Sequence, residues 1–150
     1  MQDAIQKNRE NHVTISNDFD PEIVNEILKQ CGVKSLYKQR SYLGVAKYRA
    51  KPGRFVCIMR GTDGFAAGTI GKHHFRLIDI AVRQEHQGKG YGTELMVAVV
   101  QMCKKKQLAK ITFRTNRHET APDFYKKFGG KIIGTKGEDY EMEIPLCFTS

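Results

Sequence analysis

The segment Gln87 to Gly92 has residue types and spacing suited to binding a ligand, because its glycines alternate with larger residues directly after a predicted strand. A helical pattern of apolar residues follows it. Amide N–H groups at the start of a helix have no partner within the helix, and the helix dipole adds positive potential there. Gly88, Gly90 and Gly92 allow the backbone to approach an anion closely. The segment therefore predicts a site for phosphate groups.

Two well-known phosphate-binding motifs do not fit this segment. A dinucleotide fingerprint requires Gly-x-Gly-x-x-Gly, whereas these glycines alternate. A mononucleotide loop requires Gly-Lys followed by Ser or Thr, whereas Lys89 is followed by Gly90. Two interpretations remain, a different kind of anion site and a tight connection without a ligand.

The cysteines and histidines do not indicate a metal site or a thiol nucleophile. The four cysteines are scattered and include no Cys-x-x-Cys pair: Cys31, Cys57, Cys103 and Cys147. Cys57 and Cys103 fall in predicted buried elements without a histidine at motif distance, so we expect reduced, buried thiols. His73, His74 and His86 have no ligand spacing, and we expect them on the surface.

The amino-terminal part of the chain predicts a strand and a helix. His12 to Ser16 alternates like a short strand. Asp20-Pro21-Glu22 supplies an N-cap, a proline at the first helical position and an acidic first turn for a helix that ends near Cys31-Gly32. Lys34 to Ala50 fits neither period, so both a second helix and an irregular loop stay open.

Clearer strand signals follow Lys51-Pro52-Gly53. Phe55 to Met59 and Phe65 to Ile70 predict a hairpin around the turn Gly61 to Gly64. Leu77 to Val82 is the predicted strand that leads into the glycine loop.

A helix and further strands are predicted after the glycine loop. Apolar residues recur there at helical spacing: Leu95, Met96, Val99, Met102 and Cys103. Ile111 to Thr115 is the next predicted strand, and Ala121 to Phe128 is a short helix opened by Pro122. Lys131 to Thr135 and Tyr140 to Leu146 form a last pair of strands.

These elements predict an α+β fold with one mixed, mostly antiparallel, twisted sheet. Only the central strand-helix-strand crossover from Leu77 to Thr115 has to be parallel, and we expect it to be right-handed. We find no internal repeat, linker or shift in composition, so we expect a single domain over residues 1–150.

Composition and charge narrow the classes of partner. The hydrophobic fraction of 40% and the charged fraction of 27% are near globular averages. No apolar run reaches the roughly 18 to 20 residues of a membrane span, and the start is too polar for a secretory signal, so we expect a cytoplasmic protein without a membrane partner. The net charge of +9 predicts attraction to a polyphosphate cofactor, an acidic substrate or nucleic acid.

The glycine segment and its surroundings resemble the GNAT N-acetyltransferase superfamily, whose cofactor loop reads Arg/Gln-x-x-Gly-x-Gly/Ala after a strand. Gln87 to Gly92 matches every fixed position, and Ala121 to Gly129 is similar to the helix that carries the family's tyrosine. The chain departs from the family pattern in two places. Gly130 replaces a common aromatic residue, and His118 replaces an asparagine for which Asn116 could substitute.

The resemblance implies acetyl-CoA as co-substrate and no metal. The pantetheine arm would pair with the main chain of residues 80–82, where the strands around Ile80 and Thr112 splay apart, and the diphosphate would meet amides of the loop and helix start. The implied cofactor-binding residues are Ile80, Ala81, Val82, Gln87, Gly88, Lys89, Gly90, Tyr91, Gly92, Thr93 and Asn116. Arg83, Lys89 or Lys127 could neutralise further phosphate charge.

The resemblance also implies direct attack of an amine on the thioester. Tyr125 occupies the position of the family's tyrosine and is our candidate acid for the departing thiolate, although its ring could also serve only for packing. Asp79 is our candidate base because it lies on the strand beside the thioester region, where strand alternation places Ile78 and Ile80 together on the opposite face. Asp79 could equally be a structural carboxylate. Other candidates for the base are Glu119, His118 and Glu85.

We therefore predict an acyltransferase, an acetyl-CoA-dependent N-acetyltransferase that acts on a primary amine of a small molecule, peptide or protein. One alternative acceptor is an RNA-linked amine such as aminoacyl-tRNA, suggested by the net charge with Arg114 and Arg117. Another alternative is a non-catalytic acyl-CoA-binding module. Tyr140 to Phe148 could also pair with a second subunit through an exposed strand edge and form a homodimer.

Overall fold

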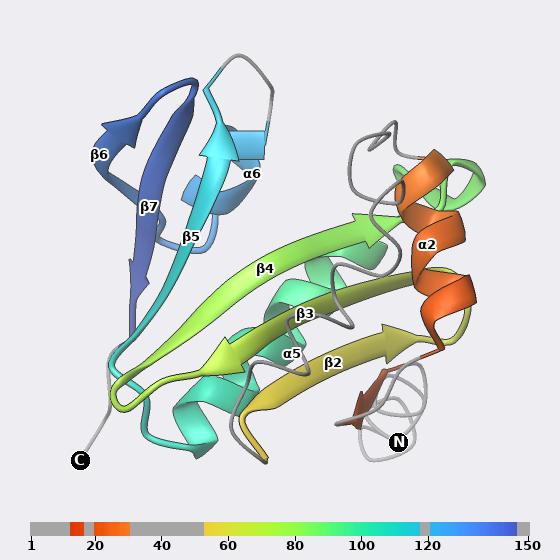
Figure 1. Ribbon diagram of the computed structural model, residues 1–150, viewed down its shortest axis with the longest axis horizontal. Helices are drawn as coiled ribbons and strands as arrows, with labels where there is room; N and C mark the ends of the chain where they lie inside the picture. Colours follow the sequence, from red (N-terminus) through yellow and green to blue (C-terminus); the bar gives the residue numbers. More distant parts are fainter. Residues whose placement is uncertain (1–12, 17–19, 31–52, 118–120, 147–150) are drawn as a thin grey trace, which may run out of the picture.

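The described strands form one mixed sheet. The computed structural model describes residues 13–16, 20–30, 53–117 and 121–146. Within these ranges seven strands lie in the order β1-β2-β3-β4-β5-β7-β6 (Figure 1). They are β1 (Thr14–Ser16), β2 (Phe55–Arg60), β3 (Gly64–Ile70), β4 (His74–Val82), β5 (Lys110–Asn116), β6 (Lys131–Lys136) and β7 (Asp139–Pro145). All neighbouring pairs are antiparallel except β4 with β5, which confirms the predicted α+β fold with a parallel crossover.

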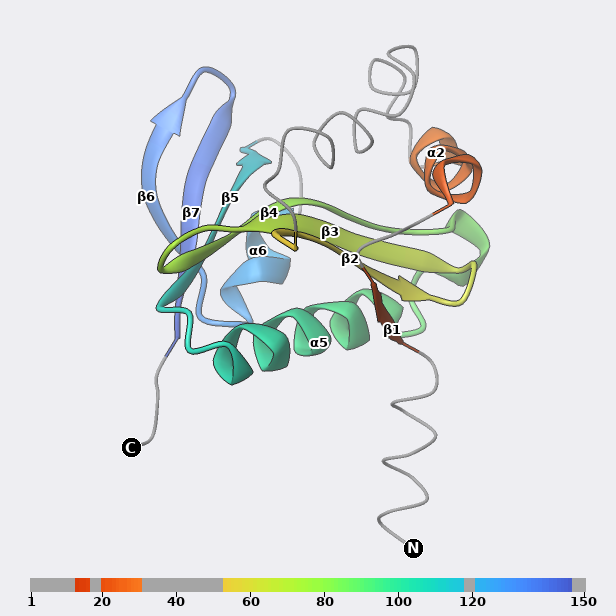
Figure 2. The ribbon, with the colours of Figure 1, turned by 60° about the horizontal axis from the view of Figure 1, so that its bottom comes forward.

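Helices cover both faces of the sheet (Figure 2). α2 (Pro21–Gln30) lies on one face, and α5 (Tyr91–Lys105) and the short α6 (Ala121–Lys126) lie on the other. The apolar positions that predicted α5 are all buried: Leu95, Met96, Val99, Met102 and Cys103. A second apolar cluster lies between α2 and the face of the sheet that α2 covers. Among the described residues, no helix is long and apolar enough to span a membrane.

A β-bulge in β4 changes which side chains share a face. The register between β3 and β4 shifts between Ala67 and Gly68, so Ile78 has no opposite residue on β3. Ile78 therefore packs in the cluster under α2, whereas Ile80 packs against the cluster under α5. The expectation that Ile78 and Ile80 share a face is wrong, because the extra residue shifts the alternation by one.

The parallel pairing of β4 with β5 stops early. β4 begins at His74, before the predicted start at Leu77, and its pairs with β5 are His74–Lys110, Phe75–Ile111 and Arg76–Thr112. Beyond these pairs, β4 continues to Val82 and β5 continues to Asn116 in diverging directions (Figure 1). The sheet thus opens from Thr112 onward, in the region where the resemblance implied that the strands splay apart.

β7 is an interior strand. It pairs with β5 on one side and with β6 on the other. The expectation that Tyr140 to Phe148 presents an exposed edge is therefore wrong, since β6 forms this edge of the described sheet. Phe148 itself, the ambiguous segment Lys34 to Ala50 and the predicted helix end at Cys31-Gly32 lie outside the described residues.

Gly68 is poorly able to accept a side chain, because it lies at the bulge. A Cβ atom at residue 68 would be 2.3 Å from the Arg76 carbonyl oxygen and 2.5 Å from Cζ of Phe75. We predict that Gly68→Ala lowers the free energy of unfolding by about 2–4 kcal/mol, since the β4 backbone and a buried ring would both have to move. Urea denaturation followed by circular dichroism measures this loss.

Gly134→Ala is the matched control for Gly68→Ala. Gly134 also lies next to a register shift, in β6, but nothing lies within 4 Å of a Cβ atom there. Its free energy of unfolding should change by less than about 0.5 kcal/mol. Equal losses in the two variants would contradict the steric explanation.

Candidate functional site

The glycine loop adopts a backbone conformation that favours glycine at two positions. The angle φ is 82° at Gly88 and 83° at Gly90, both in the left-handed region. Gly90 is the N-cap of α5, and no side-chain hydrogen bond caps the helix there. The first amides of α5 therefore lie at the positive end of the helix dipole without a capping side chain. This is the backbone arrangement that the sequence predicted for an anion site.

The side chain of Gln87 fixes the loop to the end of β4. Its Nε2 donates a hydrogen bond to the carbonyl oxygen of Val82, at 3.1 Å. A single turn of 3-10 helix, η1 (Gln84–His86), forms the connection between the two. The first fixed residue of the motif thus holds the loop against the strand that precedes it.

A pocket of about 270 Å³ opens at the loop. It is formed by the end of β4, the loop, the first turn of α5 and α6, and its lining residues are Val82, His86, Gln87, Gly88, Gly90, Tyr91, Gly92, Thr93 and Phe124. All of these except His86 and Phe124 were expected to bind the cofactor. The sequence indicated these two residues only by their position, since His86 directly precedes the motif and Phe124 directly precedes Tyr125.

The other expected cofactor-binding residues do not line this pocket. Ile80 and Ala81 follow the bulge on β4 and pack against clusters on opposite faces of the sheet. The Nζ atom of Lys89 lies 3.4 Å from Nδ1 of His86. Asn116 is the last residue of β5, at the far end of the opening between β4 and β5.

Asp79 lies at the bulge, where β4 diverges from β5. Its Oδ1 accepts a hydrogen bond from the Ile80 amide at 2.9 Å. Its negative charge also contributes to the raised pKa of Tyr125. Asp79 of β4 therefore acts electrostatically on Tyr125 of α6.

Tyr125 is buried and held by two aromatic rings. It is 8% exposed, and its ring centroid lies 4.2 Å from that of Phe113 and 5.2 Å from that of Phe124. Burial, and then the charge of Asp79, raise the pKa of the Tyr125 hydroxyl well above its ordinary value. The hydroxyl therefore keeps its proton at neutral pH, as a hydrogen-bond donor must.

The remaining candidates for phosphate binding and for the base are arranged differently. The guanidinium of Arg83 pairs with Glu26 of α2 at 2.7 Å and donates to the carbonyl of Thr62, so it joins α2 and the β2–β3 turn to η1. Lys127 and Glu85 are exposed. The two other candidates for the base, at positions 118 and 119, lie outside the described residues.

The described cysteines are buried thiols, as expected. Cys57 and Cys103 are free, and burial raises the pKa of each to about 12. A thiol with such a pKa is not a nucleophile at neutral pH. In the part of the chain that the structure describes, no group of three or more His, Cys, Asp or Glu side chains could hold a metal ion. Cys31 and Cys147 lie outside that part.

The sequence matches a known family model. The model of the acetyltransferase (GNAT) family matches residues 15–130. Among curated proteins, none matches this sequence.

Solved structures of low sequence identity share the fold. The PaiA N-acetyltransferase of Thermoplasma acidophilum, in complex with coenzyme A, is 18% identical with a TM-score of 0.69, over 89% of this chain and 99% of that chain. An acetyltransferase of Bacillus subtilis in complex with CoA is 17% identical with a TM-score of 0.67, over 91% and 99%. The ribosomal-protein-S18-alanine N-acetyltransferase of Escherichia coli is 16% identical with a TM-score of 0.65, over 92% and 96%.

The glycines of the loop should differ in their tolerance of alanine. We predict that Gly90→Ala lowers the free energy of unfolding by about 1 kcal/mol, because φ at Gly90 is left-handed. Gly92 lies inside α5, and a Cβ atom there would meet the Phe124 ring at an ordinary 3.7 Å. Gly92→Ala should therefore leave stability unchanged or raise it by up to about 1 kcal/mol, since alanine is the better helix former.

Urea denaturation of both variants and of the wild type measures the difference. The midpoint should fall for Gly90→Ala and should hold or rise for Gly92→Ala. Loss of stability in Gly92→Ala with none in Gly90→Ala would contradict the assigned backbone geometry.

Proposed function

This chain belongs to the GNAT family of acetyltransferases, and from this premise we propose that it transfers the acetyl group of acetyl-CoA directly to a primary amine of a small molecule, a peptide or a protein. The pocket at the start of α5 carries the proposal. It combines a backbone suited to phosphate with a position at the end of β4, next to the opening between β4 and β5. A long thioester with a diphosphate needs both features.

The residues present fit acetyl-CoA. The amides from Gly88 to Thr93 and the dipole of α5 would hold the diphosphate. The edge of β4 from Ile80 to Val82, which β5 no longer pairs, would hold the amide-bearing arm as an added strand. The Ile80 amide, bonded to Asp79 in this structure, would then exchange partners. When bound, acetyl-CoA supplies the acetyl group and a thiolate leaving group.

Asp79 and Tyr125 are the groups that we propose to handle protons. An amine attacks only in its neutral form, so an ammonium group first releases one proton to solvent. As the carbon–nitrogen bond forms and the carbon–sulfur bond breaks, the nitrogen loses a second proton to the Asp79 carboxylate, and this proton passes on to the departing sulfur. The Tyr125 hydroxyl donates a hydrogen bond to the sulfur while the thiolate forms.

The raised pKa of Tyr125 defines how it acts. An ordinary thiol has a pKa of about 8.5, far below that of this phenol. Tyr125 therefore stabilises the forming thiolate mainly through a hydrogen bond and retains its own proton for most of the time. Its packing against Phe113 and Phe124 holds the ring, and with it the hydroxyl oxygen, in one position.

Ligand binding and turnover test the proposed function. We expect acetyl-CoA at about a hundred times its Kd to stabilise the protein by roughly 2.7 kcal/mol, seen as a rise in Tm. A panel of small amines and of peptides with free amino termini or lysines, with release of free CoA as readout, should then identify acceptors.

Three outcomes decide between the candidate functions. No thermal shift with acetyl-CoA or with longer acyl-CoAs would overturn the proposal. A shift without CoA release on any amine, including aminoacyl-tRNA, would indicate a binding module. Release with aminoacyl-tRNA alone would indicate the RNA-linked acceptor.

Removing only the hydroxyl of Tyr125 tests its role. We predict that Tyr125→Phe lowers kcat about 100-fold, because the forming thiolate loses its donor. The Kd of acetyl-CoA should stay within roughly twofold, since the pocket at the loop is untouched. Steady-state kinetics with the best amine of the panel and calorimetric titration measure the two effects.

Tyr140→Phe is the control, because it removes a phenolic hydroxyl group from β7 and changes no residue of α6. We expect both constants of this variant to match the wild type. An unchanged kcat in Tyr125→Phe would remove Tyr125 from the mechanism.

A further inference from the structure

Arg60, the last residue of β2, is a buried cation next to the glycine loop. It is 9% exposed, its Nε donates to Glu94 Oε2, and its Nη1 lies 3.0 Å from Asp63 Oδ2. Its guanidinium carbon also lies 3.3 Å from the centre of the Tyr91 ring. Burial opposes the charge of Arg60, but Glu94, Tyr91 and Asp63 outweigh this effect, and the pKa of Arg60 is raised. Arg60 is therefore a fixed positive charge.

The partners of Arg60 come from separate segments. Tyr91 belongs to the glycine motif and lines the pocket, and Glu94 lies in the first turn of α5. Asp63 lies in the β2–β3 turn, where its Oδ1 also contacts Nε2 of His86 at 3.2 Å. Figure 1 shows this turn at the same end of the sheet as the end of β4 and the start of α5. Arg60 thus connects the turn, the loop and the helix start.

The negative charge of Glu94 is unfavourable for an anion bound at the start of α5. A carboxylate in the first turn of a helix interacts favourably with the positive end of the dipole, so it competes there with any bound anion. The side chain of Glu94 is 37% exposed, and that of Asp63 is 28% exposed. A diphosphate at the loop would therefore be repelled by two nearby carboxylates unless a cation offset them.

We propose that Arg60 is a positioning residue of the cofactor site, which offsets Glu94 and Asp63 and holds Tyr91 so that the loop accepts a diphosphate. The proposal rests on acetyl-CoA as the ligand of this pocket. Arg60 acts through the loop and the helix start, and no contact with the ligand is required of it. The sequence motif ends at Gly92 and contains neither Arg60 nor its two acidic partners.

Binding of three ligands to variants of this cluster tests the proposal. We expect Arg60→Gln to weaken acetyl-CoA about tenfold, because Glu94 is then left uncompensated next to the diphosphate. CoA without its 3′-phosphate keeps the diphosphate, so its binding to Arg60→Gln should also be about tenfold weaker than its binding to the wild type. Acetylpantetheine, which has no diphosphate, should bind both proteins equally. Isothermal titration gives each Kd and needs no acceptor amine.

The double variant Arg60→Gln/Glu94→Gln separates charge from packing. Removing both Arg60 and Glu94 leaves only Asp63, which also contacts His86, without its arginine partner, so this variant should fold even where Arg60→Gln does not. We expect its Kd for acetyl-CoA to recover to within about threefold of the wild type. A Kd still weakened tenfold in the double variant would overturn the role in charge compensation.

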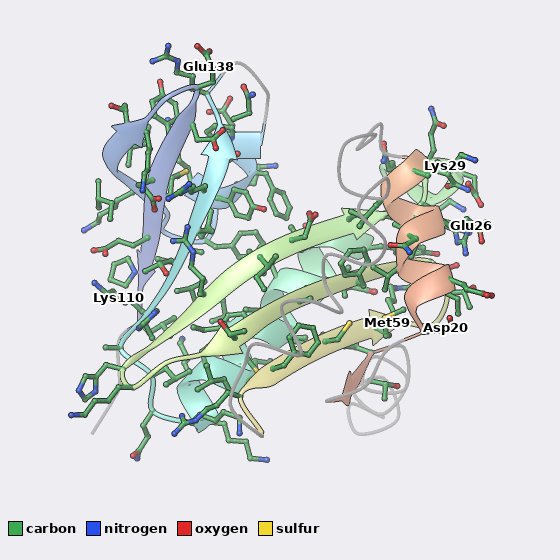
Figure 3. The ribbon with its side chains drawn as sticks, viewed as in Figure 1. Asp20, Glu26, Lys29, Met59, Lys110 and Glu138 are labelled. Atoms are coloured by element: carbon green, nitrogen blue, oxygen red, sulfur yellow. The ribbon has the colours of Figure 1, made fainter. Side chains whose placement is uncertain are left out.

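Lys110→Met is the matched control. Lys110 also pairs with a carboxylate, Glu143, at 3.3 Å. It lies at the opposite end of the sheet from Met59, the neighbour of Arg60 (Figure 3). All three Kd values of this variant should match the wild type.

These measurements distinguish a failure of the proposed diphosphate site from a failure of the role of Arg60. A wild type that does not prefer acetyl-CoA to acetylpantetheine would overturn the diphosphate site itself. If that preference exists and Arg60→Gln keeps it in full, or if Arg60→Gln weakens acetylpantetheine as much as acetyl-CoA, the role of Arg60 is overturned while the site stands.

Discussion

The limited parallel pairing between β4 and β5 is the constraint on which the site depends. The strands pair over residues 74–76 of β4 only, and the bulge at Ile78 follows at once and turns β4 away from β5. The sheet opens there without exposing its core, because α5 and α6 cover the opening from one face (Figure 2). The same turn in β4 directs its end to the start of α5, where the pocket lies.

In the proposed function, the affinity of the pocket for a diphosphate comes from backbone dipoles more than from the net charge of the chain. The formal charge is +9, yet Arg60, which contacts Tyr91, and Arg83, which precedes η1, are engaged by the carboxylates of Glu94, Asp63 and Glu26. What the loop itself offers is glycine backbone in left-handed conformation and an uncapped helix start. Arg60 is better understood as offsetting the negative charges of Glu94 and Asp63 than as adding to a positively charged surface.

The sequence predicted those features that consecutive residues determine. The glycine loop, the buried positions of α5 and the hairpin of β2 with β3 follow from local spacing, and the structure agrees with each. The bulge at Ile78, the interior position of β7 and the pairing of Arg60 with Glu94 depend on contacts between distant segments. An alternating strand looks the same at an edge and in the interior, so no local pattern could reveal them. The roles of Asp79 and Tyr125 stay predictions.

The two interpretations of Tyr125, as a packing residue and as an acid, do not exclude each other. Contacts with Phe113 and Phe124 bury the ring, and burial together with the charge of Asp79 raises the pKa of its hydroxyl. Such a hydroxyl is too weak an acid to lose its proton permanently to a thiolate. On the proposed mechanism it therefore remains a donor throughout turnover, and the proton that ends on sulfur comes from the amine by way of Asp79. The packing of the ring is thus a condition for this role.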